Sequence, residues 1–315
     1  WLGTTMPCVH YGLRGICYFM AEVSGPTRDI HSGRGGPVQE PLGELVRLLD
    51  SLVDPMSGRI LVPGISEMVP PITAEEHASF QDVDFDLEDY KQTVLGVSEV
   101  RNPSKAAVLE ALWRQPNLSI HGIEGAFAGP GCKTVIPAKV TGKFSIRLVE
   151  GMGCEAVEAL VKTHVESLHS SLGSSNRVRV WCEHAGSPFM QRPDDFNYMA
   201  CRRAIQRIYG EAPNLTRSGG SVPVTVIFQQ TGKSVLLMTM GRGDDGPHGP
   251  NEKLDRDNYL KGIKVFGTYL HEVAGDKAAL FESRVGAVAA KRRKVTLCNW
   301  SKCDPSIGCE CSVRI

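Results

Sequence analysis

The central part of the sequence alternates between strand-like segments and one long helix-like segment, and this order limits the possible folds. Residues 118–127, 134–151 and 177–186 are rich in β-branched and aromatic residues, which is typical of strands. Residues 153–173 carry apolar residues at helical spacing and end in glycine, which predicts a helix. Because two of the strands follow each other directly, we expect an antiparallel sheet with helices on one face, an α+β sandwich.

The segments before this block predict a strand, a loop and several helices. The second half of residues 7–24 alternates like a strand, and the glycines of residues 29–36 predict a loop. Residues 37–54 place Leu and Val on one helical face and open with a proline, which suits a first turn. Residues 73–80 begin with a capping-box pattern, and this helix is expected to continue with interruptions to residue 95. Residues 103–115 predict another short helix.

The segments after this block predict two helices, a bend, a strand and a tail. Residues 194–210 form an amphipathic helical pattern that ends at a glycine. Residues 217–224 are glycine-rich and predict a bend, and residues 233–241 predict a buried strand. Residues 255–275 predict the last helix. Residues 276–315 lack periodicity, so we expect them to form a disordered tail.

The ten cysteines are distributed unevenly along the chain. Six are scattered through residues 8–201 with neither metal-cluster nor disulfide-framework spacing, and we interpret them as reduced, buried thiols. Four crowd residues 298–311, just after a basic run at residues 291–294, but no C-x₂-C pair marks a zinc module there. A metal or redox role for the tail is therefore the weakest of the functional hypotheses.

The overall charge and the ends of the chain limit the partners. The 35 basic and 35 acidic residues balance, so neither nucleic acid nor an anionic membrane is expected as a partner. No apolar run reaches the length of a membrane span, and the N-terminus lacks the pattern of a signal peptide. The chain begins at Trp1 without an initiator Met, which leads us to expect a fragment or a processed product.

Eight short motifs occur in one order between residues 3 and 275: YGLRGICYF, D-x-HSG, ILVPGI, LSIHGIEGAF, KTVIP, GKFSIRLV, LTR-x-GGS-x-PVT and GDDGPHGPNEKL. This series resembles the M20 family of zinc metallopeptidases, specifically its carnosine dipeptidase and cytosolic non-specific dipeptidase group. The resemblance implies a hydrolase that cleaves small dipeptides with a metal-activated water.

The resemblance also implies an architecture that combines α/β and α+β parts. A two-layer, antiparallel-sheet lid or dimerisation domain is inserted in a zinc-peptidase α/β catalytic domain, of which only the C-terminal part is present. Residues 1–9 would end the first catalytic segment, and residues 10–200 would form the lid. Residues 201–275 would close the catalytic domain, and residues 276–315 would be a tail outside the family.

The resemblance implies two Zn²⁺ ions, or Mn²⁺ ions, in each complete active site. Members of the family hold these ions with two histidines and three carboxylates, and a further Glu acts as general base. Only one of these groups, His248, maps onto this chain, with Asp244 or Asp245 placed to orient its ring. A catalytic zinc site needs about three protein ligands, so we expect the chain to be inactive alone.

Four further residues match substrate-binding positions of the family. His31 is expected to reach across the dimer and stabilise the oxyanion, and Arg147 to grip the terminal carboxylate of the dipeptide. Thr134 and His184 match lid residues that contact the substrate. Without the resemblance, these four residues would be a turn histidine, an outward strand charge, a strand threonine and a strand-end histidine.

The glycine-rich bend matches a loop that holds the substrate through the backbone of Gly220 and the hydroxyl of Ser221. Relatives carry an acidic residue at the position of Ser218, where a negative charge suits the free amino group of a peptide. Ser218 has no such charge, so we expect weaker substrate binding.

The resemblance implies a homodimer formed through the lid. An alternative hypothesis is a non-catalytic dimerisation or interaction protein derived from a dipeptidase, because a two-fold interface is self-complementary and can survive in the lid alone. The motifs are closest to those of the cytosolic enzyme, so we expect a cytoplasmic protein, with an extracellular location as the alternative.

Overall fold

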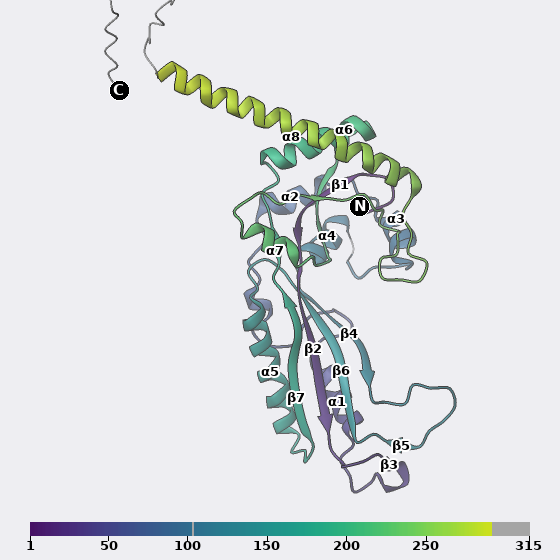
Figure 1. Cartoon of the computed structure of the whole chain (residues 1–315). Helices are drawn as coiled ribbons and strands as arrows, with labels where there is room; N and C mark the ends of the chain where they lie inside the picture. The colour runs from purple at the N-terminus through teal and green to yellow at the C-terminus, as the bar shows by residue number, and fades with distance from the viewer. Residues whose placement is uncertain (103, 292–315) are drawn as a thin grey trace, which may run out of the picture.

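The computed structural model describes the backbone of residues 1–102 and 104–291 and the side chains up to residue 275. The molecule is elongated (Figure 1), with a long antiparallel sheet at one end and a smaller sheet with most of the helices at the other. None of the helices in these described ranges combines the length and the hydrophobicity that crossing a bilayer requires.

The long sheet has four antiparallel strands in the order β4-β6-β2-β7. Their bounds are β2 Gly15–Ser24, β4 Asn117–Glu124, β6 Lys139–Leu148 and β7 Arg177–Gly186. Burial alternates residue by residue along β2, so one face of the sheet enters a core and the other stays open. This sheet is the antiparallel sheet that the sequence predicts.

Two helices cover the buried face of this sheet, α1 (Pro41–Asp50) and α5 (Cys154–Ser171). Helix α5 buries a stripe of valines at every fourth position, Val157, Val161 and Val165, against the sheet. Helix α1 begins at Pro41 and not near residue 37, because the preceding segment is fixed by hydrogen bonds between Gln39 and the loop before β7. The predicted sandwich of helices on one face of a sheet is therefore confirmed.

We call the long sheet with α1 and α5 the lid. A two-stranded sheet lies at the end of the lid that is farther from the smaller sheet, where β3 (Ile30–His31) pairs with β5 (Val135–Ile136). A 3₁₀ turn, Ser32–Arg34, follows β3 directly. The predicted loop at residues 29–36 thus contains a short strand and a helical turn. Figure 1 shows β3 and β5 beyond the ends of β2 and β6, away from the smaller sheet.

The smaller sheet is built around β1 (Cys8–Leu13), which pairs with β8 (Phe189–Met190), β9 (Asn214–Ser218) and β10 (Leu237–Met238). Only the β1–β9 pair is parallel. The buried strand predicted at residues 233–241 is wrong, because only two half-buried residues of that segment pair with β1.

Helices α6 (Phe196–Tyr209) and α8 (Arg256–Lys291) pack together on the smaller sheet. Helix α6 ends at Gly210, whose positive φ of 90° supplies the predicted glycine stop. Helix α8 runs to Lys291, beyond the end expected at residue 275. The predictions for the cysteines of residues 298–311 and most of the basic run lie outside the described residues.

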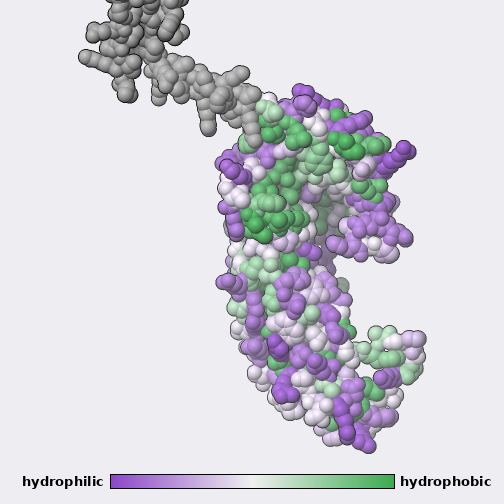
Figure 2. Space-filling view, in the orientation of Figure 1, coloured by the Kyte–Doolittle hydropathy of each residue, from purple (hydrophilic) through white to green (hydrophobic). Residues whose placement is uncertain are grey.

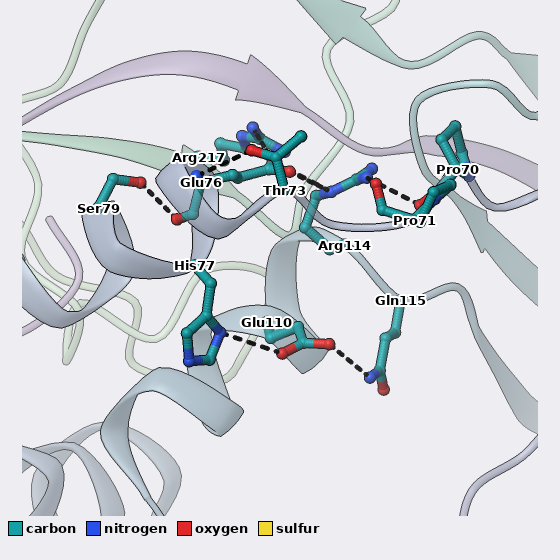
Figure 3. Close-up of polar contacts among 10 residues, drawn as sticks. All are labelled: Pro70, Pro71, Thr73, Glu76, His77, Ser79, Glu110, Arg114, Gln115 and Arg217. Atoms are coloured by element: carbon teal, nitrogen blue, oxygen red, sulfur yellow. Dashed lines mark hydrogen bonds and ion pairs between the residues drawn. The ribbon is translucent and has the colours of Figure 1, made fainter.

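Residues 70–115 form a helical unit with its own core of Phe80, Trp113 and their neighbours. Its helices are α2 (Ala74–Asp82), α3 (Leu87–Asp89), a π-helical turn (Tyr90–Leu95) and α4 (Lys105–Trp113), and Thr73 caps α2 as predicted. This unit packs against β9 through α4. Figure 3 shows the main polar link, in which Glu76 of α2 lies between Arg114, just after α4, and Arg217 of β9.

His10 occupies the middle of the smaller sheet and makes stability depend on pH. Its Nδ1 atom lies 2.8 Å from the Thr216 hydroxyl, and burial lowers the pKa of the imidazole to about 3. Below the unfolded pKa of about 6.5, His10 binds a proton in the unfolded chain but not in the folded chain. The free energy of unfolding therefore falls by about 1.4 kcal/mol for each pH unit by which the pH is lowered. Urea unfolding should show that the unmodified chain loses about 2 kcal/mol more than His10→Gln between pH 6.5 and 5. Equal losses would contradict this assignment.

Candidate active site

Arg147 and Ser221 meet where the two sheets join. Arg147 stands on the open face of β6, opposite Ile16, and its Nη1 atom donates to the Ser221 Oγ atom at 2.9 Å. The Ser221 hydroxyl in turn donates to the Arg14 carbonyl oxygen at 2.6 Å. The structure therefore brings together two residues that the sequence analysis assigned to substrate binding.

Arg14 fixes the glycine-rich loop after β9 in place, a role that the sequence analysis missed. It lies between β1 and β2, and its Nε atom donates to the Gly219 carbonyl oxygen at 3.2 Å. Its Nη1 atom donates to the Asn117 side chain on β4 at 2.7 Å. Burial lowers the pKa of Arg14 to about 10, and the neighbouring charge of Arg147 acts in the same direction. The sequence offers one sign of this role, which is a charged residue between two apolar strands.

The loop after β9 carries the remaining residues of this group. Ser218 ends β9, and its hydroxyl accepts a hydrogen bond from the Gly220 backbone N–H at 3.1 Å. An acidic side chain at this position could accept the same bond, but Ser218 brings no charge. We call Arg14, Arg147, Gly220 and Ser221 the junction group.

His184 lies on the open face of the lid sheet, next to the junction group. It stacks on Tyr18 of β2, with ring centroids 5.1 Å apart, and Tyr18 stacks on His121 of β4 at 5.4 Å. The His121 Nε2 atom lies 2.8 Å from the Ser145 hydroxyl. Three rings and one hydroxyl thus form a row across all four strands, of which the sequence analysis named only His184.

His31, on β3, lies beside Thr134, which directly precedes β5. The His31 Nε2 atom is 3.4 Å from the Thr134 Oγ1 atom, and the Nδ1 atom accepts the Gly33 backbone N–H at 3.0 Å. A neutral imidazole that accepts at Nδ1 carries its proton on Nε2, so the exposed side of His31 is a hydrogen-bond donor. We call these two residues the tip group.

The junction group and the tip group lie at opposite ends of the lid. Arg147 pairs with Ile16 near the start of β2, whereas the tip group follows its other end. The ten residues of β2 span about 30 Å as a strand. One chain therefore does not bring His31 to Arg147.

His248 is in the loop before α8 and has a left-handed backbone, with φ of 65°. The side chains of Asp244 and Asp245 both pair with Lys253, at 3.0 and 2.9 Å. Asp245 also accepts the Arg242 backbone N–H. Lys253 contacts one oxygen of each carboxylate, and the orientation of the His248 ring by Asp244 or Asp245 stays a prediction.

Metal binding needs several ligands that converge on one point. Among the side chains that the structure describes, no group of three or more His, Cys, Asp or Glu residues is placed to hold a metal ion. His248 is exposed, and a single imidazole does not complete a catalytic site. The described residues therefore do not fit a two-metal centre by themselves.

Comparison with known proteins agrees with this geometry. Residues 11–171 match the M20 peptidase dimerisation domain. The chain is 51% identical to the Cys-Gly metallodipeptidase dug1 of Schizosaccharomyces pombe over 87% of its own length and 58% of the relative. It is 45% identical to the Beta-Ala-His dipeptidase of Homo sapiens over 87% of its length and 54% of the relative.

A solved structure of the dipeptidase Dug1p from Saccharomyces cerevisiae superimposes with a TM-score of 0.85 at 44% identity, covering 87% of this chain and 57% of that one. The chain thus spans little more than half the length of these proteins. Both the order of its motifs and its fold place it in a known group: the chain belongs to the M20 metallopeptidase family, with the peptidase dimerisation domain at residues 11–171.

Proposed function

We propose that this chain is part of a dipeptidase that hydrolyses small dipeptides and works as a homodimer. The observation that carries the proposal is the junction group, in which Arg147 and Arg14 place two positive charges beside Ser221. A planar guanidinium binds a carboxylate through two parallel hydrogen bonds, so Arg147 suits the terminal carboxylate of a peptide. Gly220 and Ser221 then position the peptide backbone.

The tip group would act in the active site of a second copy. The exposed Nε2–H group of His31 can donate to the oxyanion that develops on the substrate carbonyl, and Thr134 lies beside it. Because the tip group is about 30 Å from the junction group along β2, a site that needs both takes them from two chains. His184 completes the substrate-binding set from the open face of the lid.

The metal ions, zinc or manganese, would require ligands beyond this chain. His248 would be one ligand, and it would be joined by the carboxylates and the second histidine of the family pattern. Figure 2 shows hydrophobic residues gathered over α7 (Val224–Gln229), where Ile227 is 61% and Phe228 55% exposed. This exposed apolar patch supports the proposal that a further protein segment packs on α7.

A non-catalytic interaction protein is the second candidate. Residues 11–171 match a dimerisation domain, and a two-fold interface is self-complementary, so this part of the chain supports association without catalysis. Light scattering on the purified chain distinguishes this candidate, because a strict monomer would argue against it. All six described cysteines are free, which favours a reducing compartment, and we propose a cytoplasmic protein.

The direct test uses a chimera of this chain and the part of the S. pombe relative that it does not span. The chimera should hydrolyse Cys-Gly in a chelator-sensitive manner, whereas the chain alone should not. Arg147→Ala should lower kcat/KM about 10- to 100-fold, because charge-assisted hydrogen bonds to the substrate are lost. Arg179→Ala, on the same sheet but stacked on Trp181, is the matched control and should change little. Full activity of Arg147→Ala would contradict the proposed role of Arg147 in binding the terminal carboxylate of the substrate.

A further inference from the structure

Three cysteines that are far apart in the sequence gather between the lid sheet and α5. Cys17 is on β2 and fully buried, Cys154 is the first residue of α5, and Cys182 is on β7. Cys154 and Cys182 are only partly buried. The sequence analysis interpreted these cysteines as separate thiols, because their spacing gives no sign that the fold brings them together.

Cys17 is the centre of this cluster. Its Sγ atom lies 3.9 Å from the Cys154 carbonyl oxygen, and both other cysteines pack against the buried core that contains Cys17. The Cys154 Sγ atom is 3.9 Å from the Ser187 hydroxyl, and the Cys182 thiol donates to the His184 carbonyl oxygen at 3.3 Å. The cluster therefore offers two possible thiol pairs, Cys17 with Cys154 and Cys17 with Cys182.

Strand register favours the pair of Cys17 and Cys154. On the β2–β7 ladder, Cys17 is opposite Ala185, and Cys182 is opposite Phe19, so the two cysteines do not face each other directly. A disulfide needs closely opposed Cβ atoms, about 3.5–4.5 Å apart, which a diagonal strand pair provides poorly. Cys154 lies on α5 and not on a neighbouring strand, so the strand register does not set its position relative to Cys17.

The two thiols of this pair differ in reactivity. The hydrogen bond from Cys17 lowers the pKa of Cys154, and the same contact raises the pKa of Cys17, with burial adding to the increase. The first turn of the 18-residue helix α5 also stabilises a negative charge. Cys154 is thus the partly exposed thiol that ionises more readily, and Cys17 is the buried thiol behind it.

We propose that Cys154 and Cys17 form a dithiol modification site for small organic disulfides. The Cys154 thiolate attacks a disulfide RSSR, which forms a mixed disulfide Cys154–SR and releases RS⁻. Cys17 passes its proton to the released RS⁻ and attacks the Cys154 sulfur, which expels a second RS⁻. The protein dithiol is oxidised to a Cys17–Cys154 disulfide, and RSSR is reduced to one thiol RSH and one thiolate RS⁻.

This disulfide would tie α5 to β2 at the end of the sheet that carries the junction group. Ile16, next to Cys17, pairs with Arg147 on one side and with Gly186 on the other. The modification would therefore fix the sheet directly beneath Arg147. The proposal does not depend on the proposed dipeptidase activity, since it concerns residues on the opposite face of the lid.

The test treats the purified full chain with glutathione disulfide and maps its peptides by mass spectrometry without reduction. The unmodified chain should yield a Cys17 peptide joined to a Cys154 peptide, and dithiothreitol should separate them. Cys17→Ala should stop at a glutathione adduct on Cys154, and Cys154→Ser should give neither product. The control Cys201→Ser should behave like the unmodified chain, because Cys201 is buried on α6 and burial raises its pKa to about 12.

Alanine at position 17 keeps a small apolar side chain in the core, and retained far-ultraviolet circular dichroism would establish that this variant is folded. The proposal fails if glutathione is found on the exposed Cys132 while Cys154 stays free. It also fails if Cys17 is joined to Cys182, or if folded Cys17→Ala lacks the adduct on Cys154.

Discussion

Replacing Glu76 with Ala is expected to destabilise the chain by about 3–5 kcal/mol. The Glu76 carboxylate accepts hydrogen bonds from the Nε atom of Arg114 at 3.1 Å and from Arg217 at 2.5 Å. The side chains of these two arginines are only 6% and 9% exposed. Without the carboxylate, two buried positive charges lose their shared partner, and water reaches neither of them freely.

Other contacts of the two arginines do not replace this carboxylate. Arg114 also donates to the Pro70 carbonyl oxygen at 3.0 Å, and Arg217 lies over the rings of Tyr11 and Phe80 (Figure 3 shows the polar part). These neutral groups leave the positive charges uncompensated. The substitution preserves the cap of α2, because Thr73 accepts the backbone N–H of residue 76.

Urea unfolding of the purified chain measures this effect. Glu158→Ala is the matched control, because Glu158 pairs with Lys162 at the helix surface and such pairs contribute under about 1 kcal/mol. If Glu76→Ala lowers the free energy of unfolding by no more than Glu158→Ala does, the buried network does not link the helical unit to β9.

Replacing His31 with Ala in the chimera with the S. pombe relative is expected to lower kcat about 100- to 1000-fold. In the proposed dimer, the Nε2–H group of His31 donates to the oxyanion of the transition state and makes little contact with the ground state. The loss should therefore appear in kcat more than in KM. The dimer should persist, because His31 is an exposed residue of a two-residue strand.

His77→Ala is the control for this kinetic measurement. His77 is also an exposed histidine, and it pairs only loosely with Glu110, at 3.9 Å. It lies on α2 and belongs to neither the junction group nor the tip group, so the turnover number should stay near that of the unmodified protein. A loss at His31 that appears only in KM would point to a binding role and not to oxyanion stabilisation.

The fold of the lid could be predicted from the sequence because burial imposes a period on each element. The alternation of β2 and the valine stripe of α5 are both visible in the sequence, and each buries one face against the other. The prediction of a buried strand at residues 233–241 was wrong for a different reason. The apolar run at residues 233–241 resembles a buried strand, but only Leu237 and Met238 find a partner on β1.

The site could be predicted only in part, because its contacts join residues far apart in the chain. The family motifs named Arg147 and Ser221, but the bond between them depends on how β6 meets the loop after β9. Arg14 acts through its backbone and three side-chain contacts, none of which a local pattern reveals. The pairing of Lys253 with Asp245, eight residues earlier, is likewise a contact that no local pattern reveals.

The most direct test of the site shared between two copies is a complementation assay with mixed dimers. Two forms of the chimera, one with His31→Ala and one with Arg147→Ala, are produced together, and dipeptide hydrolysis is measured. If the tip group of one chain completes the junction group of the other, each mixed dimer holds one intact site. Random assortment then restores about one quarter of the unmodified activity. Activity no higher than that of the two variants produced separately would contradict the account.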